Sequence, residues 1–251
     1  MAAAITNNPL KPSAAWTNGR ELQRIKLPAF QDNPLFVLSA GTTSDSVEAY
    51  KSLRTQLVRA KVVRSMDAVA ITSAAHADGK TLTTYNLACS CAQLNDMSVL
   101  LVDSDLRTSG LTKLIGTLPS LGLGDVLDDT TSFEQAIVAT QLDNLYVLGA
   151  GRSKKSPAEL FAGDRWAEFI TWAKQHFRLV IIDSLPVRAV ADFDLISAAC
   201  DGIAIVVRAL KTPREGIEEA LRHVDAAKLI GVIWNGAQRP PKYYSYAYST
   251  R

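Results

Sequence analysis

The chain has 251 residues, of which 47% are hydrophobic and 21% are charged, and its formal net charge is +2 at pH 7. These values are typical of a globular protein with one large core, and they argue against a dedicated nucleic-acid-binding surface, which would be strongly basic. No apolar run approaches the roughly 20 residues of a membrane-spanning helix, and the first residues do not resemble a secretion signal. We therefore expect a cytoplasmic protein.

Three cysteines, Cys89, Cys91 and Cys200, have neither zinc-ligand nor thioredoxin-type spacing. We expect them to pack as small apolar side chains in a reducing cytosol.

Composition divides the chain into three segments. Residues 1–43 are rich in Pro, Asn, Thr and Ala without a sustained period, which predicts an extended or weakly ordered N-terminal extension. Residues 44–239 carry the periodic apolar pattern of a folded domain. Residues 240–251 follow two prolines and form a tyrosine-rich tail with no face to bury, so we expect this tail to be mobile.

The domain begins with a predicted helix from Ser44. Its apolar positions recur at helical spacing and leave a basic face opposite. These positions are Val47, Tyr50, Leu53, Leu57 and Val58.

Short runs rich in Val, Ile and Leu then alternate with helical segments. Uninterrupted apolar runs of this length predict strands of a parallel sheet covered on both faces. The predicted strands are 67–73, 98–104, 144–150, 178–184, 202–209 and 230–236, and the clearest helices are 80–95, 163–176 and 213–227. The expected fold class is therefore α/β, a doubly wound and mainly parallel sheet whose ligands bind at the carboxyl ends of the strands.

A phosphate-binding loop follows the first of these strands. The residues concerned are Ala74, Ala75, His76, Ala77, Asp78, Gly79, Lys80, Thr81 and Leu82. Strand, loop and helix with Gly-Lys-Thr at the turn form a Walker A motif, in which backbone N–H groups bind phosphates, Lys80 reaches the β- and γ-phosphates and Thr81 ligates Mg²⁺. Ala74 replaces the usual glycine, which is acceptable only where the backbone does not need positive φ.

Aspartates end two other predicted strands. Asp103 and Asp105 follow one strand at a spacing that lets both project to one side, and Asp183 ends another. Carboxylates at strand ends beside a triphosphate hold Mg²⁺ or accept the proton of an attacking hydroxyl. The sequence does not decide which of the three is the base.

These motifs resemble those of the bacterial tyrosine kinases of capsule and exopolysaccharide synthesis, the CpsD/CapB type. The resemblance covers residues 44–251 and includes the Walker A loop, VLLVDSDLR, VIIDSLP and the further stretches 122–127, 156–160 and 200–208. It implies a P-loop fold of the MinD-like kind and ATP-dependent tyrosine autophosphorylation. It also implies that Asp103 is the base and that Asp105 and Asp183 lie with Thr81 on the Mg²⁺ side.

The resemblance extends to both ends of this region. Glu48, Lys51 and Arg54 match the family's E-x-x-[RK]-x-x-R helix, which implies a ring-like homo-oligomer. The tail contains four of the chain's seven tyrosines, and the resemblance implies that they are the phosphoacceptors. They are Tyr243, Tyr244, Tyr246 and Tyr248.

The resemblance implies partners and a location as well. We expect a separate membrane adaptor whose cytoplasmic tail activates the kinase, recruitment to the inner face of the cell membrane, a cognate tyrosine phosphatase and no nucleic acid. The implied role is regulation of polysaccharide synthesis and export.

Two alternatives remain open. ParA/MinD-type ATPases share the fold and both aspartate motifs, but their additional loop lysine would fall at Ala75. A nucleotide-binding scaffold with little catalysis is the other, because HADGKT and Asp183-Ser184-Leu185-Pro186 depart from the family pattern.

Overall fold

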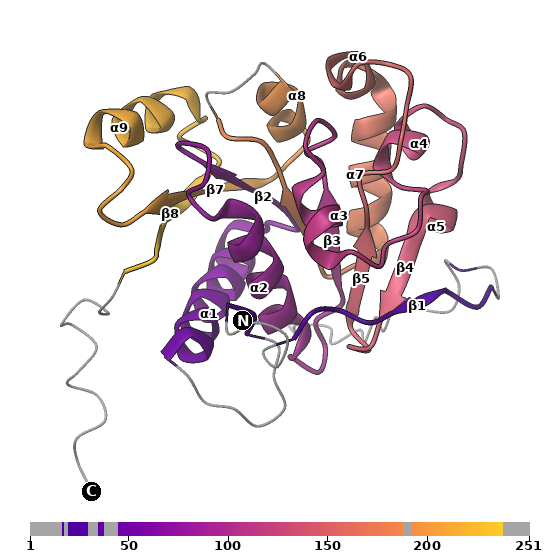
Figure 1. The fold of residues 1–251 in the computed structure, drawn as a ribbon, viewed down its shortest axis with the longest axis horizontal. Coiled ribbons are helices and arrows are strands. Elements are labelled where there is room, and N and C mark those ends of the chain that lie inside the picture. The colour runs from indigo at the N-terminus through magenta and orange to yellow at the C-terminus, as the bar shows by residue number, and fades with distance from the viewer. Residues whose placement is uncertain (1–16, 18–19, 30–34, 38–44, 188–191, 238–251) are drawn as a thin grey trace, which may run out of the picture.

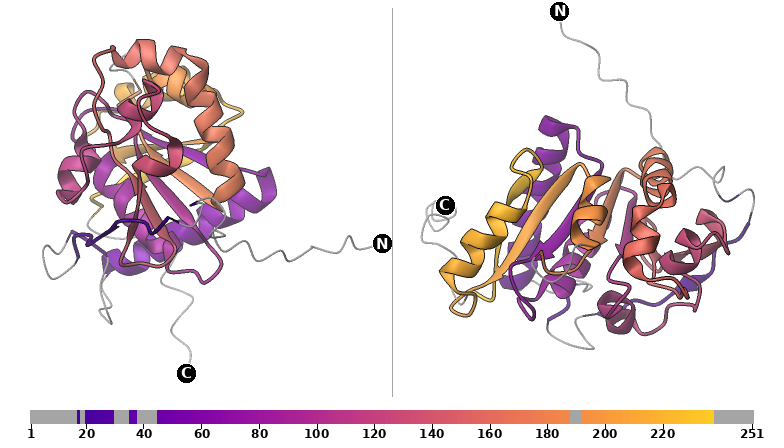
Figure 2. Two further views of the ribbon diagram at one scale, coloured as in Figure 1. Left: turned by 90° about the vertical axis from the view of Figure 1, so that its right-hand side faces the viewer. Right: turned by 90° about the horizontal axis from the view of Figure 1, so that it is seen from above.

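The computed structural model describes residues 17, 20–29, 35–37, 45–187 and 192–237. This part of the chain forms a central sheet between two layers of helices (Figures 1 and 2). The strands are β1 Arg24–Ile25, β2 Ala68–Ser73, β3 Val99–Asp103, β4 Ile137–Thr140, β5 Leu145–Leu148, β6 Leu179–Asp183, β7 Gly202–Arg208 and β8 Leu229–Asn235. Their order in the sheet is β1-β4-β5-β3-β6-β2-β7-β8, with β4 and β5 antiparallel and every other neighbouring pair parallel.

Helices cover both faces of the sheet, as a doubly wound fold requires. They are α1 Asp45–Arg64, α2 Lys80–Ala92, α3 Gly110–Ile115, α4 Leu123–Leu127, α5 Phe133–Ala136, α6 Pro157–Ala162, α7 Asp164–His176, α8 Asp192–Ala198 and α9 Arg214–His223. One hydrophobic cluster joins one face of the sheet to α1, α2 and α3, and the other joins the opposite face to α4, α6, α7, α8 and α9. The sequence therefore predicted the fold class correctly.

Successive side chains of the central strands lie on opposite faces of the sheet, which explains why there are two clusters. In β2, Ala70 packs in the cluster beneath α7 and α8, whereas Val69 and Ile71 pack in the cluster beneath α1 and α2. All six residues of β2 are buried. A strand buried on both faces has no solvent-facing positions, so β2 shows an apolar run, Ala68–Ile71, and not an alternation of apolar and polar residues; Thr72 and Ser73 at its end are also buried.

Two strands were missed by the sequence analysis. β4 is only four residues long, and β1 is two residues long and lies within the range assigned to the N-terminal extension. β1 adds to the edge of the sheet beside β4, and the nearby Leu27 is only 1% exposed. Part of the extension therefore packs on the domain, because pairing with a distant strand determines its conformation rather than any local pattern.

The predicted ends of two helices were too late. α2 ends at Ala92 rather than at residue 95, and α9 ends at His223 rather than at 227. Val224 has extended backbone and is buried, so it belongs to the core and not to a further helical turn.

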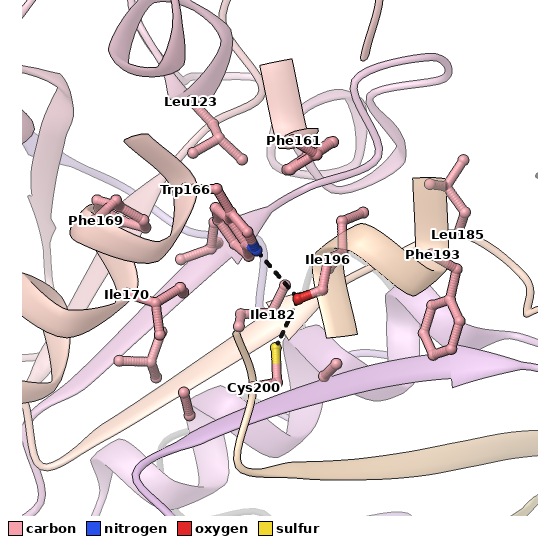
Figure 3. Packing of buried hydrophobic residues seen from close by; sticks show 14 of the residues in the cluster. Leu123, Phe161, Trp166, Phe169, Ile170, Ile182, Leu185, Phe193, Ile196 and Cys200 are labelled. Carbon is pink, nitrogen blue, oxygen red and sulfur yellow. Dashed lines mark hydrogen bonds between the residues drawn. The ribbon is translucent and has the colours of Figure 1, made fainter. Parts of the chain in front are cut away.

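An aromatic cluster fixes α7 against α8 (Figure 3). The Trp166 side chain is 2% exposed, and its indole Nε1–H donates to the Ile196 carbonyl oxygen at 3.1 Å. Phe161 meets the Trp166 ring edge-on with centroids 5.2 Å apart. The same Ile196 oxygen accepts a hydrogen bond from the Cys200 Sγ at 3.3 Å.

The cysteines are free and buried, as the sequence predicted. Burial raises the pKa of each of the three thiols, Cys89, Cys91 and Cys200, to about 12. They therefore stay neutral and pack as apolar groups.

Trp166→Phe should destabilise the protein by about 2 kcal/mol, because it leaves a cavity and removes the indole donor to Ile196. Trp172→Phe is the matched control on the same helix, where the indole is only partly buried. Urea unfolding monitored by circular dichroism measures both. An equal loss in the two variants would contradict this description of the core.

Candidate active site

Three strands bring the predicted site residues to one edge of the sheet. β6 lies between β3 and β2, and all three are parallel, so their carboxyl ends lie side by side. Asp103 and Asp183 occupy the same register position on β3 and β6. The Walker A loop leaves β2 at this edge. The structure therefore assembles the loop and the aspartates where doubly wound sheets bind ligands.

Gly79 makes the turn into α2. Its φ of +89° is left-handed, and a Cβ at this position would lie 2.1 Å from the Asn235 Nδ2. Only glycine fits both constraints. Ala74 is not among the described residues with positive φ. The backbone at this position therefore does not require glycine, and alanine is acceptable there.

Side chains from β7, β8 and the turn after β7 hold the loop. The Asp78 carboxylate accepts from the Ala75 backbone N–H at 2.8 Å and from the Thr212 hydroxyl at 2.7 Å. The Asn235 Nδ2 donates to the Asp78 carbonyl at 2.7 Å, and the Arg208 guanidinium donates to the Ala77 carbonyl at 3.3 Å.

Sequence reasoning missed Thr212 and Asn235. The signal that could have found Asn235 is a polar residue at the carboxyl end of a predicted strand, here the edge strand β8.

Lys80 and Asp183 form a buried ion pair at the start of α2. The Lys80 Nζ lies 3.0 Å from Asp183 Oδ1, and the two side chains are 8% and 0% exposed. The Thr84 hydroxyl donates to the same oxygen at 3.2 Å. Burial raises the pKa of Asp183, and the Lys80 ammonium partly opposes this shift.

The other oxygen of Asp183 has no partner. Among the described residues, Asp183 Oδ2 is a buried acceptor without a hydrogen bond. An unsatisfied buried carboxylate oxygen is costly, so this atom is suited to a cation or to a water molecule.

Asp103 is also fully buried. Its Oδ2 accepts from the Thr112 backbone N–H at 2.8 Å and from the Thr112 hydroxyl at 2.7 Å, while its Oδ1 accepts from the Asp105 N–H at 3.3 Å. Burial raises the pKa of Asp103 to about 7, and the nearby Asp183 carboxylate adds to the shift. Asp103 can therefore take up and release a proton near neutral pH.

Asp105 differs from the other two aspartates because it lines an open cavity of about 350 Å³. Its carboxylate accepts from the Thr108 N–H at 2.9 Å and from the Thr108 hydroxyl at 2.6 Å. The cavity is lined by Ser73, His76, Ala77, Asp78, Gly79, Lys80, Thr81, Leu82, Asp105, Thr108, Gly110, Leu114 and Pro186. Asp103 and Asp183 are not in this lining.

The donor set suits a hard cation that keeps other oxygen ligands. No group of three or more His, Cys, Asp or Glu side chains within the described ranges is placed to hold a metal by itself. Mg²⁺ characteristically takes one or two carboxylates and completes its shell with water and phosphate oxygens. The hydroxyl of Thr81, the carboxylate of Asp105 and the orphaned Asp183 Oδ2 fit this pattern.

The remaining predicted residues lie elsewhere. Glu48 and Lys51 form an ion pair at 2.7 Å on α1, with side chains 61% and 40% exposed. The Arg54 guanidinium instead donates to the Ser90 carbonyl of α2 at 2.9 Å. The four tail tyrosines lie outside the described residues. In the described part of the chain, no helix has the length and apolar character to cross a membrane.

Comparison with known proteins identifies the family. The chain is 35% identical over 203 residues to the tyrosine-protein kinase YwqD of Bacillus subtilis, covering 80% of this chain and 85% of that protein. The chain belongs to the bacterial tyrosine kinases. The tyrosine-protein kinase Wzc of Salmonella typhimurium is 29% identical over 243 residues, or 94% of this chain, and the chain spans only 33% of its length. No family model matches the sequence.

Solved structures agree with this assignment. The kinase domain of the Escherichia coli tyrosine kinase ETK is 25% identical, with a TM-score of 0.73, and the match covers 98% of this chain and 100% of that one. MinD of Pyrococcus horikoshii, solved with Mg-ADP, is 22% identical with a TM-score of 0.55 over 67% of this chain and 68% of its own, and this likeness concerns the fold alone. The resemblance seen in the motifs is thus confirmed.

The raised pKa of Asp103 predicts a pH-dependent stability. The carboxyl titrates near pH 7 when folded and near 3.8 when unfolded, so its stabilising contribution is complete below about pH 4 and is lost as pH rises through 7. Asp103→Asn mimics the protonated form. Without nucleotide or metal, the variant should gain about 2 to 4 kcal/mol over the parent protein between pH 4 and pH 8. Urea unfolding of both proteins across this pH range measures the gain. If the difference in unfolding free energy between the variant and the parent does not change with pH, Asp103 is not a buried carboxyl with a raised pKa.

Proposed function

We propose that this kinase transfers the γ-phosphoryl group of ATP to tyrosine hydroxyls, beginning with Tyr243, Tyr244, Tyr246 and Tyr248 of its own tail. The observation that carries the proposal is the buried Lys80–Asp183 pair beneath a cavity formed by the Walker A loop and Asp105. One cation and two carboxylates close together are what a site for a metal-bound triphosphate would need.

Each residue has a role that its surroundings favour. Backbone N–H groups of the loop bind the phosphates, and Lys80 exchanges its Asp183 partner for phosphate oxygens. Mg²⁺, held by Thr81, Asp105 and Asp183, would neutralise charge that develops on the phosphates.

The tyrosine oxygen forms a bond to the γ-phosphorus as the bond to the ADP oxygen breaks. We assign Asp103 as the acceptor of the hydroxyl proton, because its pKa of about 7 suits a general base. Since Asp103 is fully buried, its surroundings have to rearrange before a hydroxyl can reach it.

Delivery of the tail favours a reaction between subunits. In the sequence, the four tail tyrosines lie within about ten residues of Pro240 and Pro241, which would limit their reach to at most roughly 35 Å. We propose a ring-like homo-oligomer whose contacts include Glu48, Lys51 and Arg54 of α1. Several phosphates, each near −1.5 to −2 charge, would then repel one another at the subunit borders and separate the ring.

The same proposal covers regulation of the kinase. We propose that a membrane adaptor recruits the chain to the inner face of the cell membrane and completes its site, that a tyrosine phosphatase resets the tail, and that the cycle controls capsule or exopolysaccharide export. A ParA/MinD-like positioning ATPase is less well supported, because the identity to YwqD is 35% whereas the MinD likeness is 22% over two thirds of the chain.

A mixing experiment tests phosphorylation in trans. Lys80→Met protein with an intact tail should be phosphorylated when it is added to active protein whose four tail tyrosines are Phe, because the second protein has a site and the first has acceptors. Lys80→Met alone is the control and should incorporate no label, since it lacks the cation that binds the phosphates. Label from ATP, mapped by peptide mass spectrometry, reports the sites. An unlabelled mixture at concentrations where oligomers form would overturn the trans mechanism.

A further inference from the structure

A short chain of hydrogen bonds connects Asp103 to the loop that follows β5. The Thr112 hydroxyl on α3 donates to Asp103 Oδ2 at 2.7 Å, and the Ala150 backbone N–H donates to the Thr112 oxygen at 2.8 Å. Thr112 therefore connects α3 to the loop after β5, where its partner Ala150 lies 38 residues away in the sequence.

The direction of these bonds is fixed by chemistry. A hydroxyl has one proton, and here its oxygen already accepts from Ala150. The proton is therefore available for Asp103, where a hydrogen bond to a charged acceptor is stronger than one between neutral groups. Because the Thr112 N–H donates to the same oxygen at 2.8 Å, Oδ2 of Asp103 receives two short bonds.

The two oxygens of Asp103 are consequently unequal. Oδ2 is held by Thr112, whereas the one bond to Oδ1 from the described residues is the longer one, 3.3 Å, from the Asp105 N–H. We propose that Thr112 is a positioning residue that fixes the orientation of the Asp103 carboxylate through Oδ2 and leaves Oδ1 less constrained. This inference rests on the role proposed for Asp103 above.

The proposed positioning role depends on the hydroxyl of Thr112. Two substitutions can therefore distinguish the effect of the hydroxyl from the effect of side-chain volume. Thr112→Val keeps the volume and the backbone N–H but removes the hydroxyl, and Thr112→Ser keeps the hydroxyl. Thr171→Val is a matched control, because its hydroxyl donates a hydrogen bond to the Ala167 carbonyl and lies exposed on α7, away from the site.

Thr112→Val should lower kcat about 10- to 100-fold, the effect of losing one hydrogen bond to a charged group. Nucleotide affinity, measured by calorimetry with ADP, should stay within about twofold, because Thr112 does not line the cavity. Thr112→Ser should recover most of kcat, and Thr171→Val should not change it. A Val variant with the parent kcat, a Ser variant as slow as Val, or an equal loss of ADP affinity would each overturn the proposal.

A double-mutant cycle separates this inference from the proposed function. In an Asp103→Asn background, Thr112→Val should have little further effect, because the carboxylate that it positions is gone. The same loss in both backgrounds would show that Thr112 acts elsewhere. If Asp103→Asn alone leaves kcat unchanged, the role proposed for Asp103 fails, and the positioning role of Thr112 fails with it.

Discussion

The buried ion pair between Lys80 and Asp183 is the constraint on which the site depends. Both side chains are buried, and an unpaired charge there would be costly. Each therefore needs the other, or another group of opposite charge, as a partner. The pair forms because β2 and β6 are parallel neighbours, which sets the start of α2 beside the end of β6. A ligand that competes for Lys80 thus acts directly on Asp183.

The same pair influences the adjoining carboxylates. Asp103 lies at the matching register position on β3, and the Asp183 charge contributes to the raised pKa of Asp103. Thr112 and Thr84 supply hydroxyl donors to these two acids, and Thr108 does so for Asp105. Threonines in the turns and helices above the strands therefore set the orientation of each acid.

Sequence predicted the parts of this site whose signals are local. The Walker A loop and the strand-end aspartates follow from short motifs beside buried apolar runs, and all of them meet at one edge of the sheet. Thr212 and Thr112 carried no such signal, since their roles come from contacts with Asp78 and Asp103, which lie 134 and 9 residues away in the sequence. β1 and β4 were missed for a related reason, because two to four residues show no period and depend on pairing partners.

Asp183 pairs with Lys80 in the free protein, and under the proposed function it would instead help to hold Mg²⁺ once nucleotide is bound. Calorimetric titration of ADP into the parent protein and into Asp183→Asn, each with EDTA and with excess Mg²⁺, tests this exchange most directly. We expect the variant to bind metal-free ADP more tightly than the parent, because Lys80 is released, and Mg²⁺ to add little to its affinity. A variant with the parent's metal-free affinity and the parent's full gain from Mg²⁺ would show that Asp183 neither restrains Lys80 nor holds the metal.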